Sequence, residues 1–127
     1  MKREYIKRAQ YLDKIKPYIG KDIIKVIIGQ RRVGKSYMLY QIMDYIEETE
    51  ESVTFIYINK ELHEFDDLDS FEDCISYIKD KAGDSSKVCV FIDEIQEIKK
   101  FERALRSLQA EGRYDIYCTG SNSKNHT

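Results

Sequence analysis

Apolar residues recur along this chain in two alternating patterns, one with the spacing of helices and one with the spacing of buried strands. Apolar positions three or four residues apart predict helices over residues 3–16, 36–48, 70–82 and 97–111. Short continuous runs rich in β-branched and aromatic residues predict strands over residues 23–28, 53–58, 88–92 and 115–119. Strands and helices therefore alternate four times.

This alternation predicts an α/β fold, a three-layer sandwich with a parallel sheet. Near-continuous apolar strands are typical of parallel sheets that helices cover on both faces. The length of 127 residues matches one domain, which we take as residues 1–127. In such sheets ligands bind beyond the carboxyl ends of the strands, so chemistry is expected there.

Polar and glycine residues mark where several of these elements begin and end. Asp69 or Ser70 can cap the helix over 70–82, because acidic residues follow three positions later, and Gly83 fits its carboxyl end. The fourth strand is expected to end at Gly120-Ser121, since both residue types favour turns.

One motif lies between the first strand and the helix that follows it. The run Gly29-Gln30-Arg31-Arg32-Val33-Gly34-Lys35-Ser36 matches G-x-x-x-x-G-K-[ST] in the strand–loop–helix context that this pattern requires. Gly29 and Gly34 let the loop curl so that its N–H groups face an anion at the helix N-terminus. Lys35 can reach the β- and γ-phosphates, and Ser36 offers a hydroxyl to Mg²⁺. The alternative is a chance match in an ordinary turn.

Two acids follow the third strand directly. Asp93 and Glu94 come after the apolar run Val88–Ile92, so both are expected at the same sheet edge as the phosphate loop. Asp93 is suited to hold Mg²⁺, and Glu94 to orient or deprotonate the water that attacks the γ-phosphate. The alternative is that both acids are solvated or cap the next helix.

Taken together, these motifs resemble those of prokaryotic AAA+-type P-loop ATPases. The run 29–36 resembles a Walker A motif, the run 90–96 a Walker B motif with its catalytic Glu, and Thr119-Gly120-Ser121 a third family feature. The resemblance spans most of the chain and implies ATP and Mg²⁺ as ligands. It also implies an additional strand, residues 53–58, between the two Walker strands in sequence, and the fourth strand between them in space.

The resemblance further implies a sensor position where the fourth strand ends. Its candidates are Thr119, Ser121 and Asn122, of which Ser121 and Asn122 are favoured for contact with the γ-phosphate or the attacking water. Tyr37 either lies near the nucleotide or packs in the core. Arg31 and Arg32 either contact nucleotide or a neighbouring subunit, or stay solvated.

A complete module of the family implies more chain than these residues supply. The resemblance adds a fifth strand beside the phosphate-loop strand and a small helical lid, and no Arg follows Arg113 to serve as a late arginine finger. We therefore expect a core truncated at its C-terminus, with the phosphate-loop strand at an exposed sheet edge. Such an edge favours aggregation or self-pairing, and the expected partners are a second copy of the chain or a C-terminal domain absent here.

Charge and cysteine content bear on whether the chain contacts nucleic acid, forms disulfides or binds zinc. The net charge is −2, yet residues 1–35 hold eleven Lys/Arg against three Asp/Glu, so this segment is either a nucleic-acid contact or a solvated helix face. The three cysteines form no CxxC pair, and neither His has a ligand-spaced partner, so we expect neither disulfides nor zinc. Unpaired cysteines indicate a reducing compartment, so the expected location is cytoplasmic. No secretory signal or bilayer-spanning run is visible, so no membrane partner is expected.

ATP binding with Mg²⁺-dependent hydrolysis is the function that these features favour. The alternative is a nucleotide-dependent switch, or a module that binds nucleic acid or a partner protein, with negligible turnover. GTPases rank lower because Asn59-Lys60-Glu61-Leu62 lacks the Asp of the guanine-specificity motif.

Overall fold

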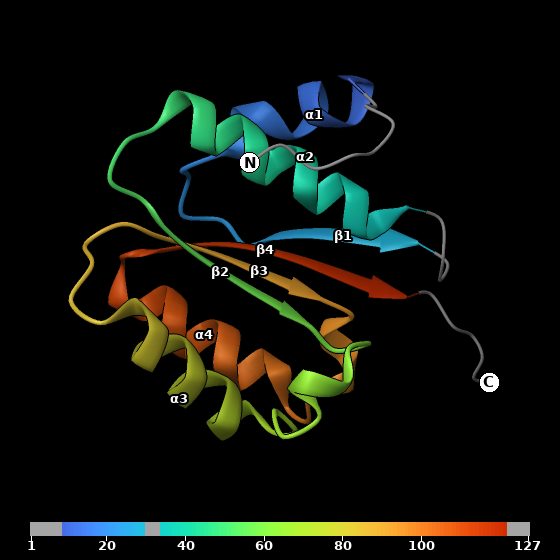
Figure 1. The fold of residues 1–127 in the computed structure, drawn as a ribbon, viewed down its shortest axis with the longest axis vertical. Coiled ribbons are helices and arrows are strands. Elements are labelled where there is room, and N and C mark those ends of the chain that lie inside the picture. Colours follow the sequence, from blue (N-terminus) through green and yellow to red (C-terminus); the bar gives the residue numbers. More distant parts are fainter. Residues whose placement is uncertain (1–8, 30–33, 122–127) are drawn as a thin grey trace.

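The computed structural model describes residues 9–29 and 34–121, which form three layers (Figure 1). A parallel sheet of four strands lies in the middle, with α1 and α2 on one face and α3 and α4 on the other. The strands are β1 (Lys25–Gly29), β2 (Thr54–Asn59), β3 (Val88–Asp93) and β4 (Tyr114–Ser121). The helices are α1 (Ala9–Ile15), α2 (Lys35–Thr49), α3 (Phe71–Ala82) and α4 (Phe101–Glu111), with short 3₁₀ turns η1 (Lys16–Tyr18), η2 (His63–Phe65) and η3 (Ile95–Glu97). The predicted α/β sandwich is confirmed.

The sheet order is β1-β4-β3-β2, and all pairs are parallel. The fourth strand therefore separates β1 from β3, as the family resemblance implies. Gly29 pairs with Ser121, and Asn59 pairs with Asp93, so the carboxyl ends of all four strands lie at one edge of the sheet. That edge is where α2 begins.

Alternating residues of the central strands supply two separate cores. Cys89, Phe91 and Tyr117 pack beneath the apolar stripe of α2, with Phe91 and Tyr117 rings stacked at 4.9 Å between centroids. Their neighbours Val90 and Ile116 point to the other face and pack against α3 and α4. The period of two along a strand thus gives each helix layer its own apolar surface.

The fourth helix starts later than its apolar spacing predicts. Residues 97–100 were expected inside it, but α4 begins at Phe101, after the 3₁₀ turn η3. The N–H of Lys99 donates to the carbonyl of Asp69, and the Lys99 carbonyl accepts from the N–H of Phe71. These backbone groups pair with the start of α3, so they are not available for helical bonds.

Other boundaries also differ from the sequence expectation, most by one residue. β1 begins at Lys25 and not at residue 23, and β4 includes Gly120 and Ser121, where the strand is expected to end. Pairing with Ile28 and Gly29 keeps these two residues extended. Of the helix expected over 3–16, the described part is α1, and the chain then turns through η1 at Pro17.

Ser70 caps α3 as one of the two predicted candidates. Its hydroxyl accepts a hydrogen bond from the N–H of Asp73, whose carboxylate in turn accepts from the N–H of Ser70. This capping box satisfies two amides that the helix itself leaves without partners.

At the amino end of the sheet, a buried ion pair ties β1 to β4. Lys25 is only 5% exposed, donates to the carboxylate of Asp115, and lies 4.6 Å from the centroid of the Tyr117 ring. Asp115 also accepts from the hydroxyl of Tyr117 at 2.6 Å. Because both charges are paired and hydrogen-bonded, the apolar strand tolerates a lysine.

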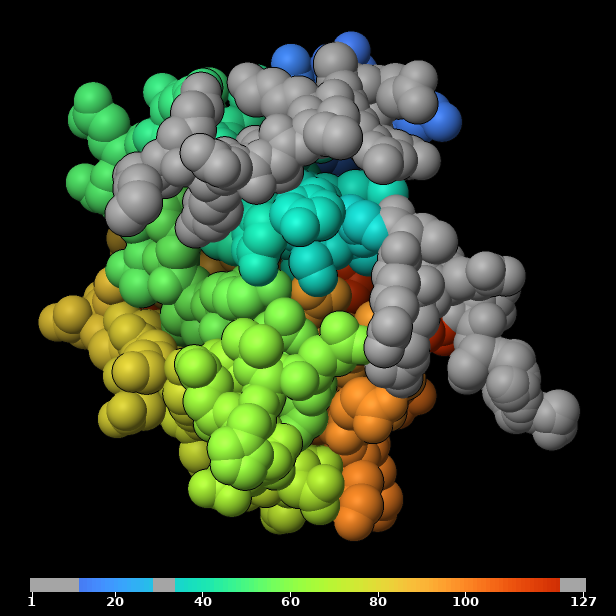
Figure 2. Space-filling view, turned by 45° about the vertical axis from the view of Figure 1, so that its right-hand side comes forward, coloured from blue at the N-terminus to red at the C-terminus, as the bar shows by residue number. Residues whose placement is uncertain are grey.

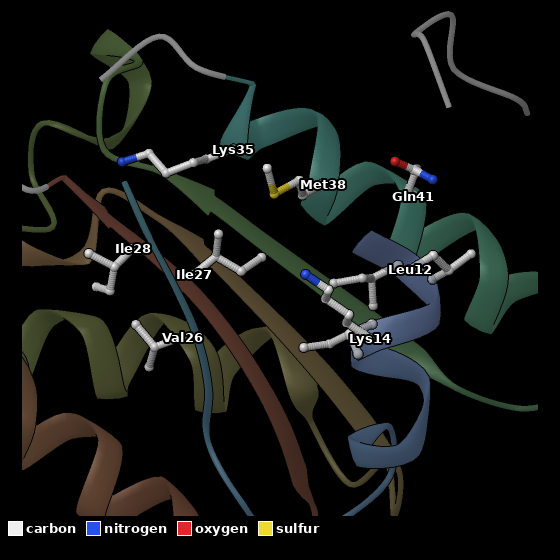
Figure 3. Close-up of a pocket in the computed structure, with 10 residues that line it drawn as sticks. Leu12, Lys14, Val26, Ile27, Ile28, Lys35, Met38 and Gln41 are labelled. Carbon is white, nitrogen blue, oxygen red and sulfur yellow. The ribbon is translucent and has the colours of Figure 1, made fainter. Parts of the chain in front are cut away.

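The outer side of β1 is open to solvent. Within the described residues, β1 pairs with β4 alone, and Val26 and Ile28 are 49% and 63% exposed. A groove of about 450 Å³ runs between α1, β1 and α2, and Figure 3 shows Lys35 at one end of it, near the end of β1. Among the described helices, none is both long and apolar enough to cross a bilayer.

Candidate functional site

The site begins where the phosphate loop enters α2. Gly34 has φ +83°, a left-handed conformation that favours glycine, and it is the residue from which α2 starts. Lys35 and Ser36 are consequently the first two helical residues, with their side chains at the helix N-terminus. The other residues of the predicted loop, Gln30 to Val33, lie outside the described part of the chain.

Lys35 reaches across the sheet edge to the end of β4. It is 4% exposed, and its Nζ donates to the carbonyl of Gly120 at 2.7 Å and to Ser121 Oγ at 3.1 Å. Its Nζ also lies 3.7 Å from Oε2 of Glu94. The ammonium group is therefore held between the predicted catalytic carboxylate and the predicted sensor residue.

Three hydroxyl groups surround Asp93, which is 2% exposed at the end of β3. Ser36 Oγ donates to Oδ2 of Asp93, and Thr119 Oγ1 donates to Oδ1. Tyr57 OH donates to Oδ2 as well, at 3.1 Å. Hydroxyl groups from three different elements thus orient the Asp93 carboxylate at the start of α2.

Glu94 follows Asp93 with a left-handed backbone, φ +60° and ψ 55°. This conformation is unusual for a residue other than glycine and is held by a hydrogen bond of 2.9 Å from the Glu94 N–H to Thr119 Oγ1. It turns the 4%-exposed side chain of Glu94 toward β4, where Oε1 accepts from Ser121 Oγ at 2.7 Å. Asp93 and Glu94 thus point to different partners although they are adjacent.

A cavity of about 250 Å³ opens over these groups. The first turns of α2, both acids and one residue of the segment after β2 line it, namely Gly34, Lys35, Ser36, Tyr37, Tyr40, Asp93, Glu94 and Glu61. Tyr37 is 50% exposed, so it is a surface residue beside the cavity and not a core residue. In Figure 2 the start of α2 (cyan) and the segment after β2 (light green) lie on the same side of the molecule.

The donor set fits magnesium. Ser36 and Asp93 bring a hydroxyl and a carboxylate oxygen together, and hard oxygen ligands with one carboxylate are what Mg²⁺ uses beside phosphates. In the part of the chain that the structure describes, no three His, Cys, Asp or Glu residues form a metal-binding cluster. A cation here would accordingly share its coordination with phosphate oxygens and water.

The cysteines lie away from this chemistry. Cys74, Cys89 and Cys118 are free thiols buried in the two cores. Burial raises the pKa of Cys74 and of Cys89 to about 12, and it raises the pKa of Cys118 as well. Protonated thiols are poor nucleophiles and metal ligands, so these residues serve packing.

The structure brings Lys35, Ser36, Asp93, Glu94 and Ser121 together, whereas Asn122 lies outside the described residues. Thr119, the less favoured sensor candidate, contacts Asp93 and the N–H of Glu94.

Sequence reasoning assigned no role to two residues at this site, Tyr57 and Gln96. A tyrosine inside an apolar strand looks like core, and the only signal for Tyr57 was its place two residues before the end of β2. Burial and a hydrogen bond with Tyr40 raise its pKa above the ordinary value, so its hydroxyl remains a donor.

Comparisons with known proteins agree with this architecture. A family profile described as an AAA domain matches residues 21–127. The structure of C. elegans PCH-2 superposes with a TM-score of 0.58 at 17% identity, over 87% of this chain and 33% of that one. At this identity the likeness concerns the fold alone.

Two curated relatives are longer proteins without a described function. An uncharacterized protein of Haemophilus influenzae is 34% identical over 125 residues, which cover 97% of this chain and 31% of the relative. An uncharacterized protein of Methanocaldococcus jannaschii is 35% identical over 109 residues, which cover 80% of this chain and 22% of the relative. The chain thus spans less than a third of either relative.

Proposed function

Because this chain belongs to the AAA domain family of P-loop ATPases, we propose that it binds ATP with Mg²⁺ and hydrolyses the nucleotide at the site around Lys35, Asp93 and Glu94. The observation that carries the proposal is the hydrogen bond from Ser36 to Asp93. Beside it, Nζ of Lys35 lies 3.7 Å from Oε2 of Glu94. These four side chains come from α2 and from the end of β3, which lie far apart in sequence. Stability alone gives no reason to gather them at one cavity.

Each side chain has a role that follows from its position. Lys35, buried at the helix N-terminus, supplies a positive charge for the β- and γ-phosphates, and the first N–H groups of α2 add partial positive charge. Ser36 and Asp93 are the proposed Mg²⁺ ligands, with Thr119 and Tyr57 orienting Asp93. Mg²⁺, when bound, neutralises charge on the phosphates.

Glu94 is the proposed group that orients or deprotonates the attacking water. Ser121 Oγ, which contacts both Glu94 and Lys35, is the proposed sensor of the γ-phosphate. Catalysis of this kind depends on positioning and on charge neutralisation more than on covalent chemistry. Asn122 and the loop residues Gly29 to Val33, with Tyr37 beside them, remain proposed nucleotide contacts.

Calorimetric titration with ATP and Mg²⁺ tests nucleotide binding. Lys35→Ala is expected to weaken binding by about 10- to 100-fold, the effect of removing charged hydrogen bonds. Lys81→Ala on the outside of α3 is the matched control, since that lysine is exposed and distant from the cavity. If the unaltered chain shows no binding at millimolar ATP, the proposal is wrong.

Phosphate release separates hydrolysis from a nucleotide-dependent switch. Glu94→Gln keeps the shape of the side chain and removes the base, so turnover should fall by about 10²- to 10⁴-fold while ATP affinity is retained. A basal rate that is unchanged by Glu94→Gln contradicts hydrolysis through Glu94. ATP binding without measurable turnover in the unaltered chain would instead favour the switch.

The open edge of β1 bears on domain organisation. Val26 and Ile28 expose apolar surface there, and the relatives extend well beyond the matched region. The proposed occupant of this edge in such longer proteins is a further parallel strand, with residues 1–127 forming most of one nucleotide-binding core. Backbone groups and apolar side chains would then be covered together.

A further inference from the structure

Gln96 connects Glu94 to the end of β4 through both ends of its side-chain amide. Its Nε2 donates to Oε1 of Glu94 at 2.6 Å, and its Oε1 accepts from the backbone N–H of Ser121 at 3.3 Å. A Cβ added to Gly120 would lie 3.4 Å from that same Oε1, so the amide rests directly on the backbone of β4.

These contacts determine which way the amide faces. A backbone N–H can only donate, so the Gln96 atom that faces Ser121 must be the oxygen. The NH₂ group is therefore directed at Glu94, where a carboxylate can only accept. Reversing the amide would replace two hydrogen bonds by two repulsive contacts.

The segment that carries Gln96 is well anchored. Gln96 lies in η3 between Ile95 and Ile98, which are 4% and 1% exposed. Glu94 on its other side has the left-handed backbone that Thr119 holds. The side chain of Gln96 thus extends from a fixed position, and its distance from Glu94 is set by packing.

One oxygen of the Glu94 carboxylate consequently accepts two hydrogen bonds, which fix its position. Oε1 accepts from Gln96 at 2.6 Å and from Ser121 Oγ at 2.7 Å, while Oε2 faces Lys35. Ser121 and Lys35 are the groups that a γ-phosphate would also contact. Gln96 is given no contact with phosphate, because its amide is bonded at one end to Glu94 and at the other to the backbone N–H of Ser121.

We propose that Gln96 is a positioning residue that fixes the Glu94 carboxylate relative to β4, and so sets where Glu94 meets the attacking water. The inference rests on the proposed hydrolysis. It assigns Gln96 no contact with nucleotide, so its loss should lower turnover and leave ATP affinity unchanged. Displacing a catalytic carboxylate slightly is sufficient to slow a reaction strongly.

A double-mutant cycle on phosphate release tests this role. Gln96→Ala should lower kcat by about 10- to 100-fold, the usual effect of removing a group that orients a catalytic ligand, with ATP Kd changed less than about twofold. In a Glu94→Gln background the same substitution should have almost no further effect, since it acts through Glu94. Gln109→Ala on α4, whose amide donates to the carbonyl of Asp22 at 3.1 Å, is the matched control.

Gln96→Glu provides a second variant of nearly unchanged size. It puts an acceptor where a donor faces Glu94, so kcat should fall further than in Gln96→Ala. Equal losses from Gln96→Ala in the presence and absence of Glu94 would overturn the proposal, as would a parallel loss of ATP affinity. Thermal melts of both variants distinguish these results from misfolding.

NMR spectroscopy tests the positioning role of Gln96 without measuring ATP hydrolysis, so the two proposals can fail separately. In ¹⁵N NMR spectra the side-chain NH₂ of Gln96, identified by its loss in Gln96→Ala, should shift on Glu94→Gln while the NH₂ of Gln109 stays in place. An unmoved Gln96 signal would overturn the positioning role. If the unaltered chain hydrolyses no ATP, the proposed function fails, and the NMR result still decides whether Gln96 holds Glu94.

Discussion

Asp93, the proposed Mg²⁺ ligand, is a buried acid whose side chain is hydrogen-bonded on both oxygens. An isolated carboxylate at 2% exposure would be strongly disfavoured, but hydroxyls from Ser36, Tyr57 and Thr119 all donate to it. They come from α2, β2 and β4, so the carboxylate is oriented by three elements at once. Tyr57 is the donor that no motif in the sequence contains.

Removing the Tyr57 hydroxyl should therefore weaken the proposed Mg²⁺ site without disturbing the core. Tyr57→Phe keeps the ring, which lies 5.7 Å from that of Tyr40, and removes one hydrogen bond to Asp93. We expect the Mg²⁺ concentration for half-maximal ATP binding to rise by about 10-fold, the effect of losing a group that orients a ligand. Calorimetry at varied Mg²⁺ measures it.

Tyr77→Phe is the matched control for this prediction. Tyr77 lies on α3, with its ring 6.0 Å from that of Phe65 and away from the site. An equal change in Mg²⁺ dependence in both variants would show that Tyr57 does not act through Asp93.

At the scale of elements, local hydrogen bonds determine where α3 begins, whereas tertiary pairing determines where α4 begins. Ser70 and Asp73 begin α3 with hydrogen bonds that lie entirely within four residues. The start of α4 is instead delayed by the pairing of Lys99 with Asp69 and Phe71, which are about thirty residues away in sequence. Local chemistry predicts the first boundary, and only the folded chain explains the second.

The capping box makes a stability prediction. Ser70→Ala removes the hydroxyl that accepts from the N–H of Asp73, so the free energy of unfolding should fall by about 1 kcal/mol. Ser76→Ala, an exposed site within α3, should leave stability unchanged or slightly higher because alanine favours helix. Urea denaturation monitored by circular dichroism compares the two, and equal losses would contradict the capping role.

At the scale of the whole molecule, β1 is an edge strand of the described sheet. One side of β1 is paired with β4, and the other is open to solvent. Its inner side is tied to β4 by five register pairs and by the Lys25–Asp115 contact. Its outer side exposes Val26 and Ile28 beside the groove of about 450 Å³. Exposed apolar edge strands promote pairing between chains.

The 127-residue chain should accordingly self-associate through β1. Replacing both Val26 and Ile28 by Lys places charge along the edge and should shift the chain toward monomer in light scattering after size-exclusion chromatography. Leu62→Lys, at another exposed apolar residue, should leave association unchanged. A chain that is monomeric before any substitution would contradict the prediction.

How far the site was predictable depended on the kind of residue. Lys35, Ser36, Asp93 and Glu94 stood in motifs whose residue types and spacing already imply phosphate and metal chemistry. Gln96 was visible in the Asp-Glu-Ile-Gln run but without a role, since its partner Ser121 is 25 residues away. For Tyr57 the sequence offered only its place two residues before the end of β2, because a strand does not reveal which atom its side chain meets across the sheet.

The sequence by itself determined the α/β alternation, the parallel sheet and the strand–loop–helix context of the phosphate motif, because periodicity and glycine placement are local properties. The tertiary structure shows β4 between β1 and β3, the order that the family resemblance implies, and it alone decided that Lys35 meets Gly120 and Ser121. It also gave Asp93 its three hydroxyl donors and Glu94 its partner Gln96. These contacts depend on which strands become neighbours, and that is settled only when the whole chain packs.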